Sequence, residues 1–135
     1  EALVLTREVY TRRVAMFGVS NEDTLLSALN LIISYTRALR FAEAKKMILE
    51  QLPIANRVLG KDHQMTLAFQ RNIVIGLLRD EKSTREDALQ AEKIVKDMLV
   101  RLRRVYGPTH PDTRLMEEHW LCQAQEKLAT YDSRA

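Results

Sequence analysis

The sequence predicts an all-α fold, an α-solenoid of about six antiparallel helices, and three observations lead to this prediction. The chain has 135 residues, of which 46% are hydrophobic, and this length suits one compact domain. Four glycines, three prolines and 6% aromatic residues are too few turn and strand formers for a β-sandwich or barrel. An internal repeat with a period above 40 residues is typical of stacked helix pairs.

The repeat is marked by three glycines that lie 42 and 47 residues apart: Gly18, Gly60 and Gly107. A threonine follows each glycine by six residues, and an alanine precedes it by sixteen. The longer second copy therefore carries five extra residues before Ala91, in the polar stretch 80–84. Because Ser83 and Glu86 have the spacing of a capping box, we expect a new helix to start there.

Each copy divides into an A helix, which follows the threonine, and a B helix, which ends before the next glycine. The single domain 1–135 then has the order B-A-B-A-B-A. It consists of a partial repeat at 1–17, repeats at 18–59 and 60–106 with an insertion near 80–84, and a C-terminal helix at 107–131. Glycine tolerates the positive φ of a helix C-terminus, so it should end each B helix.

Apolar residues form one stripe on every helix of the repeat, as helical periodicity requires. In the A helices they are Leu31, Ile32, Tyr35, Ile73, Val74, Leu77, Trp120, Leu121 and Ala124. In the B helices they are Leu5, Tyr10, Phe17, Met47, Leu52, Leu59, Ile94, Leu99 and Tyr106. One helix pair cannot bury both of its stripes, so we expect neighbouring pairs to stack.

The motif Gly107-Pro108-x-His110-Pro111-Asp112-Thr113 resembles the tetratricopeptide repeats of the kinesin light chain type, which are longer than the ordinary 34-residue repeat. The first copy adds Leu25, Ala28-Leu29-Asn30-Leu31 and Tyr35 to this resemblance, which covers nearly the whole chain. It implies a right-handed superhelix whose A helices line a concave groove. A period of 40 to 47 residues also fits HEAT-like and other helix-pair arrays, which are the alternative.

The resemblance would point one face of each A helix into the groove, two, six, nine and thirteen residues after the threonine. These residues are Leu26, Asn30, Ile33 and Arg37, then Ala68, Asn72, Ile75 and Arg79, then Leu115, His119, Cys122 and Glu126. A carboxamide offers both a donor and an acceptor, so Asn30 and Asn72 could each hold the backbone of an extended peptide. Alternatively, each asparagine caps or bridges neighbouring helices.

The charge of this face favours an acidic peptide. Guanidinium groups bind carboxylates in a bidentate fork, and Arg37, Arg71 and Arg79 lie on or beside the face. Shallow apolar pockets would be formed by Ile33 and Ile75, while His119 takes the place of asparagine in the third copy. Grooves of the light-chain type take short peptides with an aromatic residue among acidic ones, and the resemblance implies such a ligand here.

Other functional classes find little support in the sequence. A formal charge of +3 does not indicate nucleic-acid binding, and no apolar run reaches the roughly 18 residues of a membrane helix. No motif supplies a nucleophile with its acid or base, so we expect neither an enzyme nor a cofactor. The pair His119 and Cys122 provides only two ligands, so we expect no metal. One cysteine favours a reducing compartment, and we expect a cytoplasmic protein.

The sequence therefore predicts a non-catalytic protein-interaction module that binds an extended, acidic peptide. The alternative is a structural or self-associating arm of a larger protein with no peptide ligand of its own. The first helix favours this alternative, because it lacks the A helix that would cover its apolar residues Leu3, Leu5, Val9 and Val14. A homo-oligomer could then form through exposed terminal helices.

Overall fold

The computed structural model describes residues 2–133, and within them the secondary structure is entirely helical, as predicted. The elements are α1 (Ala2–Phe17), α2 (Glu22–Arg37), α3 (Phe41–Val58), α4 (Gln64–Arg79), α5 (Arg85–Val105), α6 (Pro111–Leu115), the π-helical turn η1 (Met116–Leu121) and α7 (Cys122–Ser133). Because α6, η1 and α7 follow one another without a break, they form one C-terminal helix. The order of six predicted helices is thus confirmed in this part of the chain.

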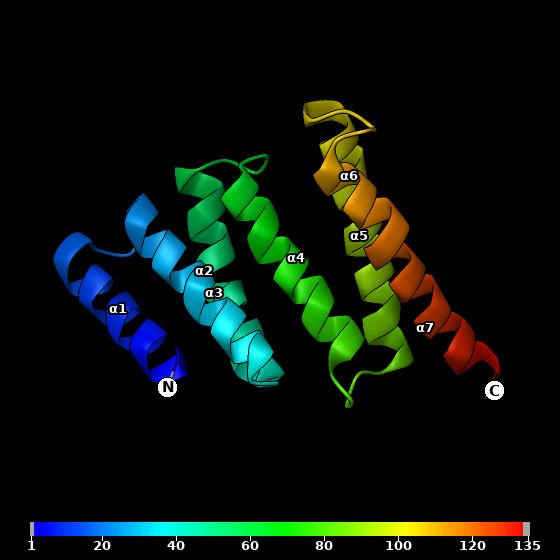
Figure 1. The fold of residues 1–135 in the computed structure, drawn as a ribbon, viewed down its shortest axis with the longest axis horizontal. Helices are drawn as coiled ribbons and strands as arrows, with labels where there is room; N and C mark the ends of the chain where they lie inside the picture. The colour runs from blue at the N-terminus through cyan, green and yellow to red at the C-terminus, as the bar shows by residue number, and fades with distance from the viewer. Residues whose placement is uncertain (1, 134–135) are drawn as a thin grey trace. The chain divides into compact units, whose positions relative to one another are not determined.

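The chain divides into two compact units, one reaching to Gly76 and the other beginning at Leu77. The first unit contains α1, α2, α3 and most of α4, and α1, α2 and α3 run antiparallel to their neighbours in sequence (Figure 1). The second unit contains the end of α4, α5 and the C-terminal helix, which runs antiparallel to α5 (Figure 1).

Glycines end three of the helices in the backbone conformation that the sequence predicts. The φ angles of Gly18, Gly60 and Gly107 are 77°, 90° and 88°. Their amides donate to the carbonyl oxygens four residues earlier, at 2.9, 3.2 and 3.1 Å. These bonds satisfy carbonyls that the helix end would leave without a partner.

Side-chain caps start the A helices at equivalent places in the three copies. Asn21 Oδ1 accepts from the amide of Asp23 at 2.8 Å, and His63 Nδ1 accepts from that of Met65 at 3.0 Å. His110 Nδ1 accepts from the amide of Asp112 at 3.1 Å. The two histidines occupy equivalent positions in the repeat, 47 residues apart, and each satisfies an amide of the first helical turn.

The predicted capping box lies one residue later than the sequence spacing indicates. Thr84, not Ser83, is the N-cap of α5, and its Oγ1 accepts from the amide of Asp87 at 3.2 Å. The Asp87 carboxylate accepts from the Thr84 amide at 2.9 Å, so Asp87 takes the place predicted for Glu86. The Ser83 amide donates to Asp80 O at 3.0 Å, and its carbonyl accepts from the Tyr131 hydroxyl. These bonds hold Ser83 in the preceding turn.

The core of the first unit lies between α2 and its neighbours. Small or apolar residues of α2, α3 and α4 are almost fully buried there: Leu25, Ala28, Ile32, Ile48, Ala55 and Phe69. Burying each large side chain in this set contributes on the order of 1.5–3 kcal/mol. The predicted A-helix stripe is confirmed for α2, because Leu31, Ile32 and Tyr35 are all buried.

The predicted stripe of the first B helix is wrong at two positions. Leu5 and Phe17 are 61% and 46% exposed, whereas the predicted stripe residue Tyr10 is half-buried. Leu3 is buried instead, at 6% exposure. The reason is that α1 packs against α2 and touches α3 through Tyr10, so only the sides of α1 that face these helices lose contact with water.

The C-terminal helix widens at η1, which the sequence pattern does not reveal. Its buried residues are spaced by three, four, four and four: Thr113, Met116, Trp120, Ala124 and Leu128. A regular helix has 3.6 residues per turn, so a spacing of four would rotate this stripe away from α5. The wider π turn takes up the excess and keeps the stripe on one side.

We predict opposite effects when two glycines of the first unit are replaced by alanine. Gly60→Ala should destabilise the protein by about 1–2 kcal/mol, because φ is 90° there. Gly76→Ala is the matched control. It lies inside α4, where an added Cβ would be 3.8 Å from Phe41 Cδ1, so it should stabilise by up to about 1 kcal/mol. Urea unfolding measures both effects, and equal effects of the two variants would contradict this account of the turn.

Candidate peptide-binding surface

One face of α2 carries three of the predicted ligand-binding residues in accessible positions. Asn30 and Arg37 are exposed and Ile33 is half-buried, and Leu26 on the same face is 46% exposed. Neither the Asn30 carboxamide nor the Arg37 guanidinium has a hydrogen bond or ion pair to another residue in the described part of the chain. This face therefore combines an amide, a cation and apolar surface, all open to solvent.

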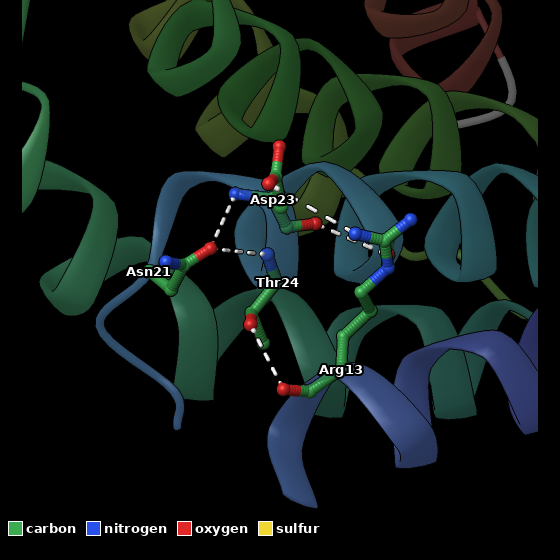
Figure 2. Close-up of polar contacts among 5 residues, drawn as sticks. Arg13, Asn21, Asp23 and Thr24 are labelled. Carbon is green, nitrogen blue, oxygen red and sulfur yellow. Dashed lines mark hydrogen bonds and ion pairs between the residues drawn. The ribbon is translucent and has the colours of Figure 1, made fainter. Parts of the chain in front are cut away.

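The start of α2 is anchored to α1, and this anchor orients the face (Figure 2). The Thr24 hydroxyl is buried and donates to Arg13 O at 3.3 Å. Arg13 also pairs with Asp23 at 3.9 Å, and Asn21 caps the helix through the amides of Asp23 and Thr24. Because these bonds fix the rotation of α2, Asn30 lies on the side away from the buried stripe.

The equivalent residues of α4 are more buried than those of α2. Asn72 is only 6% exposed, and its Nδ2 donates to Ala68 O at 2.8 Å within the same helix. Arg71 and Ile75 are half-buried, and Ala68 is buried. Of the two predicted asparagines, Asn30 presents its carboxamide to solvent and Asn72 does not, and the binding role of each stays a prediction.

The two remaining predicted residues lie in the second unit and meet around Trp120. The guanidinium of Arg79 lies 5.3 Å from the centroid of the indole ring, within the range of a cation–π contact. The His119 ring stands edge-on to the same indole at 4.5 Å. Trp120 was predicted only as a core residue and is indeed buried, but its ring also contacts both predicted residues.

A cleft of about 400 Å³ in the first unit was missed by the sequence reasoning. Residues of three helices line it: Arg7, Tyr10, Thr11, Leu31, Tyr35, Glu43, Lys46, Met47 and Glu50. Arg7 Nη2 donates to the Tyr35 hydroxyl at 3.1 Å, and Gln51 Nε2 donates to that of Tyr10 at 2.8 Å. No motif marks this cleft, because its residues come together only through packing.

Burial perturbs one titratable group in this cleft. The pKa of Tyr10 is raised above its ordinary value, chiefly because burial disfavours the phenolate. The hydrogen bond from Gln51 opposes this shift, and the nearby negative charge of Glu50 adds to it. Tyr10 therefore remains neutral through the physiological range, and its hydroxyl serves as a polar anchor between α1 and α3.

Nowhere in 2–133 do three or more histidine, cysteine, aspartate or glutamate side chains form a group that could hold a metal ion. Cys122 is a free, exposed thiol. None of the helices in this range has the length and apolar character needed to span a membrane.

Comparison with known proteins adds no assignment. No family model matches the sequence, and no curated protein matches it either.

The raised pKa of Tyr10 predicts a pH dependence of stability in the alkaline range. The neutral phenol is favoured in the folded state, so its contribution is complete below the ordinary tyrosine pKa of about 10 and is lost as the pH rises through the folded-state pKa. Tyr10→Phe should remove this part of the alkaline loss. At neutral pH it should cost about 1 kcal/mol, because Gln51 loses its partner.

Urea unfolding of the wild type and Tyr10→Phe from pH 7 to 11.5 measures the difference. The free energies of unfolding of the two proteins should converge as the pH rises above about 10. A constant difference across this range would contradict the assigned effect of Tyr10.

Proposed function

We propose that the chain is a non-catalytic interaction module built from tetratricopeptide repeats of the kinesin light chain type, and that the exposed face of α2 binds an extended, acidic peptide. The repeat spacing and the helix order support the repeat assignment. The proposed function involves no reaction, and binding of the peptide requires no cofactor.

The observation that carries this proposal is the exposed carboxamide of Asn30, one helical turn away from both Ile33 and Leu26. An extended peptide has backbone N–H and C=O groups without partners, and one carboxamide can satisfy one of each. The half-buried Ile33 offers an apolar contact for a ligand side chain. Arg37, one turn further along, offers two parallel N–H donors to a carboxylate.

The other predicted residues are less accessible to a ligand than Asn30, or lie in the second unit. Arg71 and Ile75 of α4 are half-buried and would contribute a charge and an apolar edge. Asn72 would need to exchange its bond to Ala68 O for one to the peptide. Arg79 and His119 belong to the second unit, where both contact the Trp120 ring, so their predicted contact with a ligand is a separate proposal for that unit.

A second candidate function is a structural or self-associating arm, and one observation favours it. The side of α1 that faces away from α2 exposes large apolar residues, among them Leu5 and Met16. Such residues mark interaction surfaces when they are contiguous. This function needs no peptide ligand, so peptide binding separates the two candidates.

The test is a titration of the full chain with fluorescein-labelled acidic peptides that carry one aromatic residue, followed by anisotropy. We expect Asn30→Ala to weaken binding about tenfold, the equivalent of about 1.4 kcal/mol. Arg37→Ala should weaken it by a smaller factor and reduce its salt dependence, because exposed charges are screened. Lys45→Ala is the matched control, since it removes one exposed positive charge from α3 instead.

Equal effects of Arg37→Ala and Lys45→Ala would mean that only net charge matters, and would contradict a specific surface on α2. So would unchanged affinity in Asn30→Ala. If none of the peptides binds, the structural function is the better account.

A further inference from the structure

The side of α1 that faces away from α2 is an apolar stripe in contact with solvent. Leu5, Val9 and Met16 are 61%, 45% and 70% exposed, and their spacing places them on one face of the helix. Val4 and Phe17 add further exposed apolar surface at its edges. The stripe lies on a different helix from Asn30 and Arg37, so a binding role for α1 does not rest on the proposed function.

The equivalent face of α3 shows which elements can cover a surface of this kind. A shift of 42 residues places Ala2, Leu5 and Val9 of α1 on Ala44, Met47 and Gln51 of α3. These three residues of α3 are only 4%, 8% and 3% exposed. The α3 face is closed by α2, which packs along α3, and by α1, whose Tyr10 hydroxyl accepts from Gln51 at 2.8 Å. The same surface is therefore covered in one repeat and bare in the other.

The exposed face of α1 also has a hollow of the kind that receives a side chain from a facing helix. A hollow of about 330 Å³ is lined by Val9, Arg12, Arg13, Met16 and Phe17. The first four of these lie at i, i+3, i+4 and i+7, the four positions that form a hole for one side chain of a facing helix. The α1 surface thus presents a socket for an apolar side chain from a second helix.

The charge around the socket determines the chemistry of the partner. Arg12 is exposed and has no ion pair among residues 2–133, while Arg13 makes a long contact of 3.9 Å with Asp23 and lies 5.9 Å from the centroid of the Phe17 ring. Two guanidinium groups beside an apolar socket favour carboxylates on the partner. The helices α2 and α3 are antiparallel, and the start of α2 lies beside the end of α3, where Arg57 donates to the Ser20 hydroxyl at 3.3 Å. An antiparallel partner of the same kind would bring the acids of its first turn to Arg12 and Arg13.

The C-terminal helix does not supply such a partner. Its residues Arg114 and Glu118 correspond to Leu25 and Leu29 of α2, which are buried. Arg114 and Glu118 are instead exposed, and Arg114 Nε lies 3.4 Å from Glu118 Oε1. The stripe that α2 uses for packing is therefore charged in the C-terminal helix.

We propose that α1 is a docking surface for an amphipathic α-helix that lies antiparallel to it. The partner helix inserts apolar side chains between Leu5, Val9 and Met16, and its first turn carries carboxylates that meet Arg12 and Arg13. It packs on α1 as α2 packs on α3.

The probe is a labelled synthetic peptide with the sequence of residues 21–38 of this chain, which contains Asn21, Glu22, Asp23 and the apolar stripe of α2. It is titrated into the full chain and followed by anisotropy, with a peptide of residues 110–131 as the comparison. We expect the first peptide to bind and the second to bind at least about tenfold more weakly, because its equivalent stripe is charged.

Variants of the full chain locate the binding. Leu5→Glu should weaken binding of the first peptide at least about tenfold, since it places a charge in the apolar contact. Leu49→Glu is the matched control, because Leu49 is 58% exposed on α3 and should leave the affinity unchanged. Arg12→Gln should weaken binding several-fold, and this effect should disappear at high salt or with a peptide that carries Gln and Asn in place of Glu22 and Asp23.

Three results would overturn the proposal. One is equal binding of the two peptides, and another is equal loss in Leu5→Glu and Leu49→Glu. The third is a chain that sediments as a dimer which Leu5→Glu converts to a monomer, since the occupant of the face would then be a second copy. Unfolding curves that are superimposable for Leu5→Glu and wild type verify that the variant is folded.

Discussion

The burial of α2 between its neighbours is the constraint on which the candidate surface depends. Ala28 and Ile32 of this helix are completely buried, and Thr24 is buried at the contact with α1. A helix held on these sides has one remaining face in water, and that face carries Asn30 and Arg37. The position of the candidate ligand-binding groups is therefore a consequence of packing on the opposite side of the helix.

The same constraint explains why equivalent B helices differ. In a stack of helix pairs each helix is stabilised by its nearest neighbours, so a helix with one neighbour fewer leaves part of its stripe exposed. In the first unit, Met47 and Gln51 of α3 have neighbours on this side, whereas Leu5 and Val9 of α1 do not. Burying apolar area of this kind is favourable by about 25 cal/mol per Å², so contact with another helix would stabilise α1.

Several local features followed from sequence because they depend on a few adjacent residues. Gly60 ends α3 as predicted, since positive φ at a helix end depends on the residue itself. The caps by His63 and His110 are local too, because each Nδ1 accepts from an amide only two residues later. The sequence spacing indicates the N-cap of α5 one residue too early, because Ser83 and Thr84 are each followed by an acidic residue three positions later. Ser83 differs in its bonds to Asp80 and to Tyr131, and the second of these partners lies 48 residues away.

Sequence by itself determined the all-helical class, the order of the helices and the glycine turns, because periodicity and backbone preference are local properties. Tertiary structure alone decided which repeated residues reach solvent. Asn30 and Asn72 occupy the same repeat position, yet Asn30 is exposed and Asn72 is 6% exposed and bonded to its own helix. The physical reason is that burial is set by the helices packed around a residue, and these differ from one copy of the repeat to the next.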